Sequence, residues 1–66
     1  MNSMFETGEH IKVKDFYTQE IQPGVFEIDH VDIVLHYDDE IRTYRVKNIE
    51  TGQLIEGLCW REIESL

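Results

Sequence analysis

Alternation of apolar and polar residues most constrains the fold, because it has the period of a β-strand along most of the chain. The segment from His10 to Tyr17, for example, places Ile11 and Val13 on one face of an extended chain and two lysines on the other. No apolar stripe at helical spacing runs for three turns. The sequence therefore predicts strands rather than long helices.

Turn-forming residues divide these runs into short segments. The breaks are Pro23-Gly24, the polar stretch Asp38-Asp39-Glu40, and Thr51-Gly52. We expect a 3₁₀ turn and a short closing strand after the last long run, with Ile63 and Leu66 pointing inward. The four longer predicted strands are His10 to Tyr17, Val25 to Tyr37, Ile41 to Ile49 and Leu54 to Trp60.

The second predicted strand changes its alternation once along its length. Phe26 and Ile28 share a face, and the apolar positions then become odd-numbered from Val31 to Tyr37. A slip of this kind indicates an extra residue in the strand, so a β-bulge or sharp bend is predicted at Asp29-His30.

The length of the chain sets the size of the core. With 66 residues we expect one domain spanning residues 1–66, with residues 1–7 frayed. Cys59 is the only cysteine, so no intrachain disulfide stabilises the fold. The longest unbroken apolar run is Ile33-Val34-Leu35, and the first nine residues do not resemble a leader. We therefore expect a cytoplasmic protein with no contact to a membrane.

The order of these segments resembles that of small bacterial and phage SH3-like barrels. The resemblance covers most of the chain, although Gln22 and Pro23 replace the first part of the usual Gly-x-x-Gly-x-Val loop. It implies an all-β, SH3-like, five-stranded, partly open antiparallel barrel; the alternative is a simple antiparallel sheet with a C-terminal helix. The matching segments are Gly8 to Val13, Pro23-Gly24, Val25 to Tyr37, Tyr44-Arg45-Val46, Thr51-Gly52 and Trp60 to Leu66.

Negative charge is concentrated in one part of the sequence. No lysine or arginine occurs between Lys14 and Arg42, and the eight acids in this interval equal the whole formal net charge of −8. The remaining acids and bases balance one another. The eight acids are Asp15, Glu20, Glu27, Asp29, Asp32, Asp38, Asp39 and Glu40.

Part of this charge is expected to be neutralised across the hairpin formed by the second and third strands. A two-residue turn at Asp39-Glu40 would place Asp32 opposite Lys47 and Val34 opposite Arg45, whereas a longer loop would place Asp32 opposite Arg45. Either register pairs a base of the third strand with an acid of the second. The three acids at the turn have no such partner in the sequence and are predicted to form an uncompensated cluster.

Protein binding is the function class that these features favour. An acidic surface can dock on a basic one, as an inhibitor or accessory factor does, although acidity can also serve solubility alone. Exposed aromatic side chains would mark the contact, because so small a domain cannot bury every ring. The long loop after Tyr17 either contributes to the contact or folds Ile21 beneath it. The predicted partner-binding residues are Tyr17, Ile21, Glu27, Asp29, Asp38, Asp39 and Glu40.

Other function classes fit less well. His10, His30 and His36 lack metal-ligand spacing, no nucleophile–base motif or phosphate loop is present, and nothing points to a cofactor. We therefore expect neither an enzyme nor a metal site.

The net charge opposes direct nucleic-acid binding. Arg42, Arg45 and Lys47 form the one basic strip, and Tyr44 between them is expected to fill the core because it lies on the opposite face of the strand from Arg45. The alternative function is therefore a nucleic-acid-associated barrel acting within a larger complex. Edge strands also allow the chain to form homo-oligomers.

Overall fold

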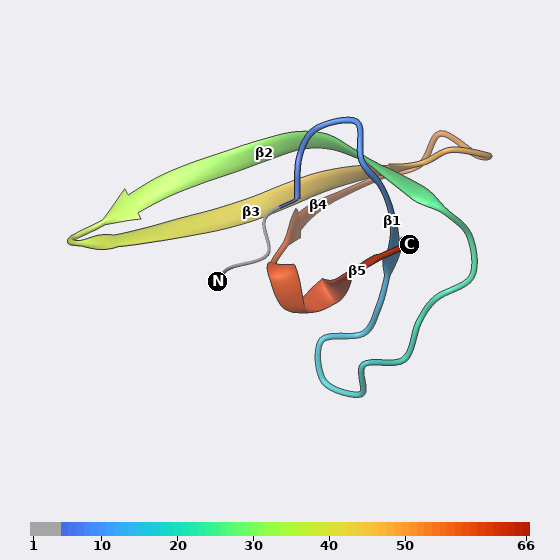
Figure 1. Ribbon diagram of the computed structural model, residues 1–66, viewed down its shortest axis with the longest axis horizontal. Coiled ribbons are helices and arrows are strands. Elements are labelled where there is room, and N and C mark those ends of the chain that lie inside the picture. Colours follow the sequence, from blue (N-terminus) through green and yellow to red (C-terminus); the bar gives the residue numbers. More distant parts are fainter. Residues whose placement is uncertain (1–4) are drawn as a thin grey trace.

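The computed structural model describes residues 5–66 as an all-β chain, with five antiparallel strands in one open sheet (Figure 1). The strands follow the order β4-β3-β2-β1-β5, and one turn of 3₁₀-helix, η1, precedes the last strand. The predicted all-β class is therefore confirmed. The element bounds are His10–Val13 (β1), Phe26–His36 (β2), Asp39–Asn48 (β3), Leu54–Leu58 (β4), Trp60–Glu62 (η1) and Ile63–Ser65 (β5).

The predicted bulge in β2 is confirmed, since the register of β2 against β3 shifts between Ile28 and His30. Phe26 and Ile28 are buried before the bulge, and Val31 packs partly buried against the same core after it. The extra residue thus compensates for the change from even to odd apolar positions and keeps these side chains on one face of the sheet.

The core is a single apolar cluster on one face of the sheet. Tyr44 is 2% exposed, so the prediction that it fills the core is confirmed. Its ring meets that of Phe5 edge to face, with 5.7 Å between the ring centroids. The cluster consists of Phe5, Ile11, Val13, Phe26, Ile28, Tyr44, Val46, Leu58 and Ile63.

The predicted fraying of residues 1–7 is not met at Phe5, because Phe5 is 7% exposed in the core. The segment after it is also held by hydrogen bonds: the Gly8 amide donates to the Ile28 carbonyl over 2.8 Å, and the Ile28 amide donates to the Glu9 carbonyl over 2.9 Å. Fraying of residues 1–4 falls outside the described residues.

The C-terminal segment forms η1 and then β5, which pairs with β1. The predicted 3₁₀ turn and closing strand are confirmed. Of the alternative, the C-terminal helix is wrong, whereas its antiparallel sheet agrees with the open sheet observed. Ile63 is buried as predicted, but Leu66 is 70% exposed rather than inward. β4 ends at Leu58, two residues before the predicted limit, because Trp60 already belongs to η1.

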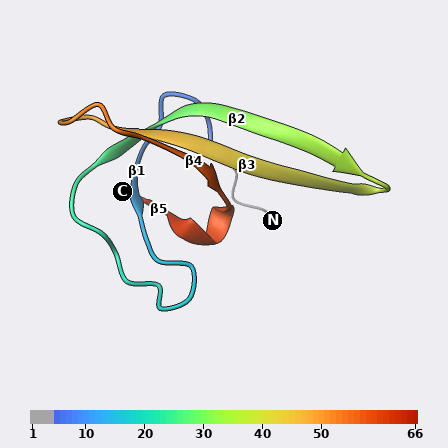
Figure 2. The same cartoon turned by 180° about the vertical axis from the view of Figure 1, so that it is seen from behind.

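The molecule is elongated, with extents of 38 × 24 × 19 Å. Its long axis follows the β2–β3 hairpin, which extends away from the rest of the sheet in both views (Figures 1 and 2). The turn between β3 and β4 lies at the opposite end of that axis, and the loop of residues 14–25 extends to one side of it, at the bottom of Figures 1 and 2. Within the described residues, no helix is long and apolar enough to cross a membrane.

Candidate interaction site

The β2–β3 hairpin continues well past the core (Figure 1). Its outer part, residues 32–42, forms an arm. All of these residues except the last are exposed. The two strands stay paired as far as His36 opposite Asp39. The flanking strands stop earlier, because β1 pairs with β2 only as far as Glu27 and β4 pairs with β3 only as far as Tyr44.

Apolar side chains lie exposed on both faces of the arm. Directly paired residues share a face of an antiparallel ladder, so Ile33 and Leu35 continue the face that carries the core, while Val34 and Ile41 lie on the opposite face. Contiguous exposed apolar surface marks interaction sites. The exposed fractions are 52% for Ile33, 55% for Val34, 75% for Leu35, 93% for Tyr37 and 47% for Ile41.

None of these five residues belongs to the predicted partner-binding set. One signal was available, because three consecutive apolar residues in a strand place apolar side chains on both of its faces. A strand with apolar side chains on both faces is typically buried on both of them. Among the described residues, no element packs closely enough on either face to bury residues 32–41 of the arm.

The turn at the end of the arm is Tyr37-Asp38, two residues earlier than the predicted Asp39-Glu40 turn. Both predicted registers are therefore wrong: Asp32 lies opposite Thr43, and Arg45 lies opposite His30. Tyr37 has a φ of 57°, a value that a bulky side chain rarely adopts. A two-residue hairpin turn requires a positive φ at its first position, which explains this value.

The three acids near the turn differ in their surroundings. Asp38 and Asp39 form no ion pair among residues 5–66. Glu40 Oε2 accepts a hydrogen bond from Arg42 Nε at 2.6 Å, so the prediction that Glu40 has no partner is wrong. A pair two residues apart in one strand shares a face, which explains the contact. The uncompensated cluster is therefore reduced to Asp38 and Asp39.

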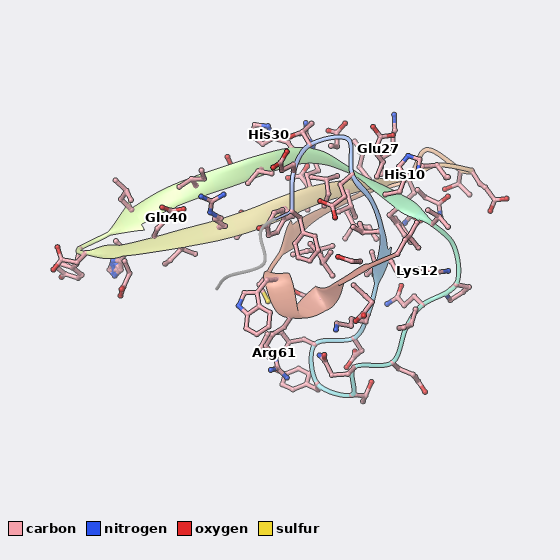
Figure 3. The ribbon with its side chains drawn as sticks, in the orientation of Figure 1. His10, Lys12, Glu27, His30, Glu40 and Arg61 are labelled. Atoms are coloured by element: carbon pink, nitrogen blue, oxygen red, sulfur yellow. The ribbon has the colours of Figure 1, made fainter. Side chains whose placement is uncertain are left out.

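Glu27 and Asp29 lie at the body end of β2, away from these acids; Figure 3 labels Glu27 there and Glu40 on the arm. Asp29 Oδ2 is 2.7 Å from Arg45 Nη2, in an ion pair that is about one-third exposed on each side. Glu27 lies opposite Lys47 in the register. The structural pairing role predicted for Arg45 is confirmed, with Asp29 rather than Asp32 as its partner.

Tyr17 and Ile21 belong to the loop of residues 14–25, which extends from the body at the bottom of the view in Figure 1, away from the arm. Tyr17 is 86% exposed and Ile21 is 53% exposed. The amides of Thr18 and Tyr17 donate to the Asp15 carboxylate, and these bonds lower the pKa of Asp15. The predicted binding residues are thus divided between two separate surfaces.

The loop is fixed to η1 through Arg61, which Figure 3 shows beside η1. The guanidinium carbon of Arg61 lies 5.1 Å from the ring centroid of Phe16 and 5.9 Å from that of Trp60. Gln19 Nε2 also donates to the Arg61 carbonyl at 3.2 Å. This cluster therefore has a structural role, because it joins two segments that share no strand pairing.

A shallow depression lies on the sheet where the arm begins, with a volume of ≈ 40 Å³. Binding sites for small molecules are commonly larger, at roughly 300–1,000 Å³. Among residues 5–66, no cluster of three or more histidine, cysteine or carboxylate side chains is arranged to hold a metal ion. The depression is lined by His30, Asp32, Thr43, Tyr44, Arg45, Glu56 and Gly57.

Comparison with known proteins gives no further assignment: no family model, curated protein or solved structure matches this chain.

Proposed function

We propose that this chain is a small SH3-like domain that acts as a non-enzymatic, cytoplasmic protein-interaction module through its arm. The strand order β4-β3-β2-β1-β5 and the 3₁₀ turn before the last strand support the SH3-like resemblance. The resemblance does not select a function, because one fold hosts many functions. The functional proposal therefore depends on the arm.

The single observation that carries the proposal is an arm with apolar side chains on both faces and free carboxylates at its end. Burial of Ile33 or Leu35 by a partner would remove apolar surface from water, which favours association. Asp38 and Asp39 would attract basic groups beside that surface and raise the association rate. The partner is thus a protein with an apolar strip bordered by lysine or arginine, and the domain is its inhibitor or accessory factor.

The nucleic-acid alternative has weaker support. Its basic strip was to consist of Arg42, Arg45 and Lys47, yet each of these lies beside or opposite an acid. Glu40 pairs with Arg42, Asp29 pairs with Arg45, and Lys47 is opposite Glu27. A strip with these neighbours offers little net positive charge to a phosphate backbone.

Affinity capture from a bacterial lysate tests the proposal with a matched pair of variants. D38N/D39N removes two charges from the arm tip, whereas E50Q/E56Q removes two charges from exposed positions on β4 and the loop before it. Both variants change the net charge from −8 by the same amount. We expect D38N/D39N to lose a basic protein that E50Q/E56Q retains. Retention should also be stronger at about 0.1 M salt than at about 1 M, where screening is nearly complete.

Two results would contradict this proposal. Equal loss of the captured protein in both variants would show that only net charge matters. The second result is recovery of nucleic acid with the wild type. If nuclease digestion of that nucleic acid also releases the captured proteins, the result favours the alternative function.

A further inference from the structure

The outer edge of β2 along the arm has no strand beside it. β1 pairs with β2 at Phe26 and Glu27, and the backbone of Ile28 bonds to Gly8 and Glu9. Beyond Ile28, no described residue forms a backbone hydrogen bond to this edge. Beyond the bulge this edge carries neither lysine nor proline as far as His36, and its one carboxylate is Asp32.

The hairpin fixes which backbone groups point outward from this edge. His36 and Asp39 close a two-residue turn, and the closing pair of such a hairpin is hydrogen-bonded. Because hydrogen-bonded and non-hydrogen-bonded pairs alternate along the ladder, Val31, Ile33 and Leu35 direct their N–H and C=O groups away from β3. A second strand can therefore bond to these three residues without disturbing the hairpin.

The sequence of this edge is complementary to itself in the antiparallel direction. With Val34 at the centre, Ile33 of one copy lies opposite Leu35 of the other, and both direct their backbone groups toward the partner. Asp32 of each copy then lies opposite His36 of the other, on the face that carries Val34. An opposed carboxylate and imidazole can hydrogen-bond, and opposed apolar side chains pack together, so both pairs favour antiparallel pairing.

The ladder between the two copies ends at the Asp32–His36 pairs, because Tyr37 and Asp38 form the turn, and His30 already lies 3.3 Å from Asp32 Oδ1 of its own strand through its Nε2. Centring on Ile33 instead would oppose His30 to His36, and centring on Leu35 would pair only residues 34–36 of the two copies. Registers that pair outward residues with inward ones cannot form the ladder. Val34 is therefore the centre that the chemistry favours.

We propose that the outer edge of β2 pairs with the same edge of a second copy of this chain, antiparallel and centred on Val34. The two arms then form a four-stranded sheet around a two-fold axis, as expected for an isologous interface. The two bodies lie at opposite ends, because each arm projects away from its own body (Figures 1 and 2). Asp38 lies in the turn and Asp39 lies on β3, so the two docking carboxylates stay outside this contact and self-pairing is independent of docking on a basic partner.

Light scattering after size exclusion, over a concentration series up to millimolar, tests the pairing. We expect a monomer–dimer equilibrium at about 0.15 M salt that persists at about 1 M, since screening weakens repulsion between two acidic chains. Docking on a basic protein should instead weaken with salt. A monomer at every concentration would overturn self-pairing and leave the proposed function intact.

Proline variants test the edge itself. Leu35→Pro removes an outward N–H from β2, whereas Glu40→Pro removes the outward N–H directly opposite it on β3. We expect Leu35→Pro to abolish the dimer and Glu40→Pro to preserve it, with both variants retaining the circular dichroism of a β-sheet. Loss of the dimer in both variants, or in neither, would overturn the assignment to β2.

A charge exchange tests the register and does not depend on proline. D32K opposes Lys to His36 of the second copy, and H36D opposes Asp to Asp32, so each single variant should weaken dimerisation roughly fivefold or more through two symmetric pairs. The double variant D32K/H36D places Lys opposite Asp and should recover wild-type dimerisation. Single variants that dimerise as tightly as the wild type, or a double variant no tighter than the single variants, would overturn the register.

Discussion

Truncation of a valine to alanine should cost very different amounts of folding free energy in the two strands of the β2–β3 hairpin. Val46 of β3 is 0% exposed in the core, whereas Val34 of β2 is 55% exposed on the arm. We predict that Val46→Ala lowers the free energy of unfolding much more than Val34→Ala does. Both changes share the same loss of strand propensity, so their difference reports burial.

The size of the effect follows from the buried surface. Two methyl groups taken out of the core lose about 1.6 kcal/mol of transfer free energy, and the resulting cavity brings the cost of Val46→Ala to about 2–3 kcal/mol. Val34→Ala should cost less than about 1 kcal/mol. A chain of this length has only about 3–10 kcal/mol of total stability, so the first variant loses a large share of it.

Urea unfolding followed by far-ultraviolet circular dichroism measures both values, at concentrations low enough to keep the chain monomeric. Thermal unfolding should show Val46→Ala melting about 10 °C or more below the wild type. Equal costs for the two variants would refute the reasoning, because they would mean that the arm packs against the body as closely as the core does.

Two further predictions concern local geometry and charge. Tyr37→Gly should raise stability by about 1 kcal/mol, because glycine adopts the φ of 57° without strain; a loss of stability in urea unfolding would contradict this. The pKa of Asp15 is lowered in the fold by amides of Thr18 and Tyr17, so its contribution is present above the ordinary carboxyl range and is lost as the pH falls through the lowered pKa. The unfolding midpoint of Asp15→Asn should therefore fall less steeply than that of the wild type below about pH 4, and parallel curves would contradict the assignment.

The candidate site was only partly predictable from the sequence. Its acids were identified as a group, but Glu27 and Asp29 lie at the body end of β2, and Glu40 is paired with Arg42. The sequence positions of these acids are enough to count the charge of the segment. Which base each acid pairs with depends on the register between β2 and β3. A turn two residues earlier than expected changed every cross-strand partner.

Local pattern determined the β-strands, the bulge at Asp29-His30 and the burial of Tyr44, because each follows from which side of an extended chain a residue occupies. Tertiary structure decided which apolar faces are covered. β2 and β3 have 11 and 10 residues, whereas the flanking β1 and β4 have 4 and 5. The shorter strands end before the hairpin does, so Ile33 and Leu35 have the alternation of core residues and yet lie in solvent. Alternation assigns a side chain to a face, but only the lengths and positions of neighbouring strands determine whether that face is buried.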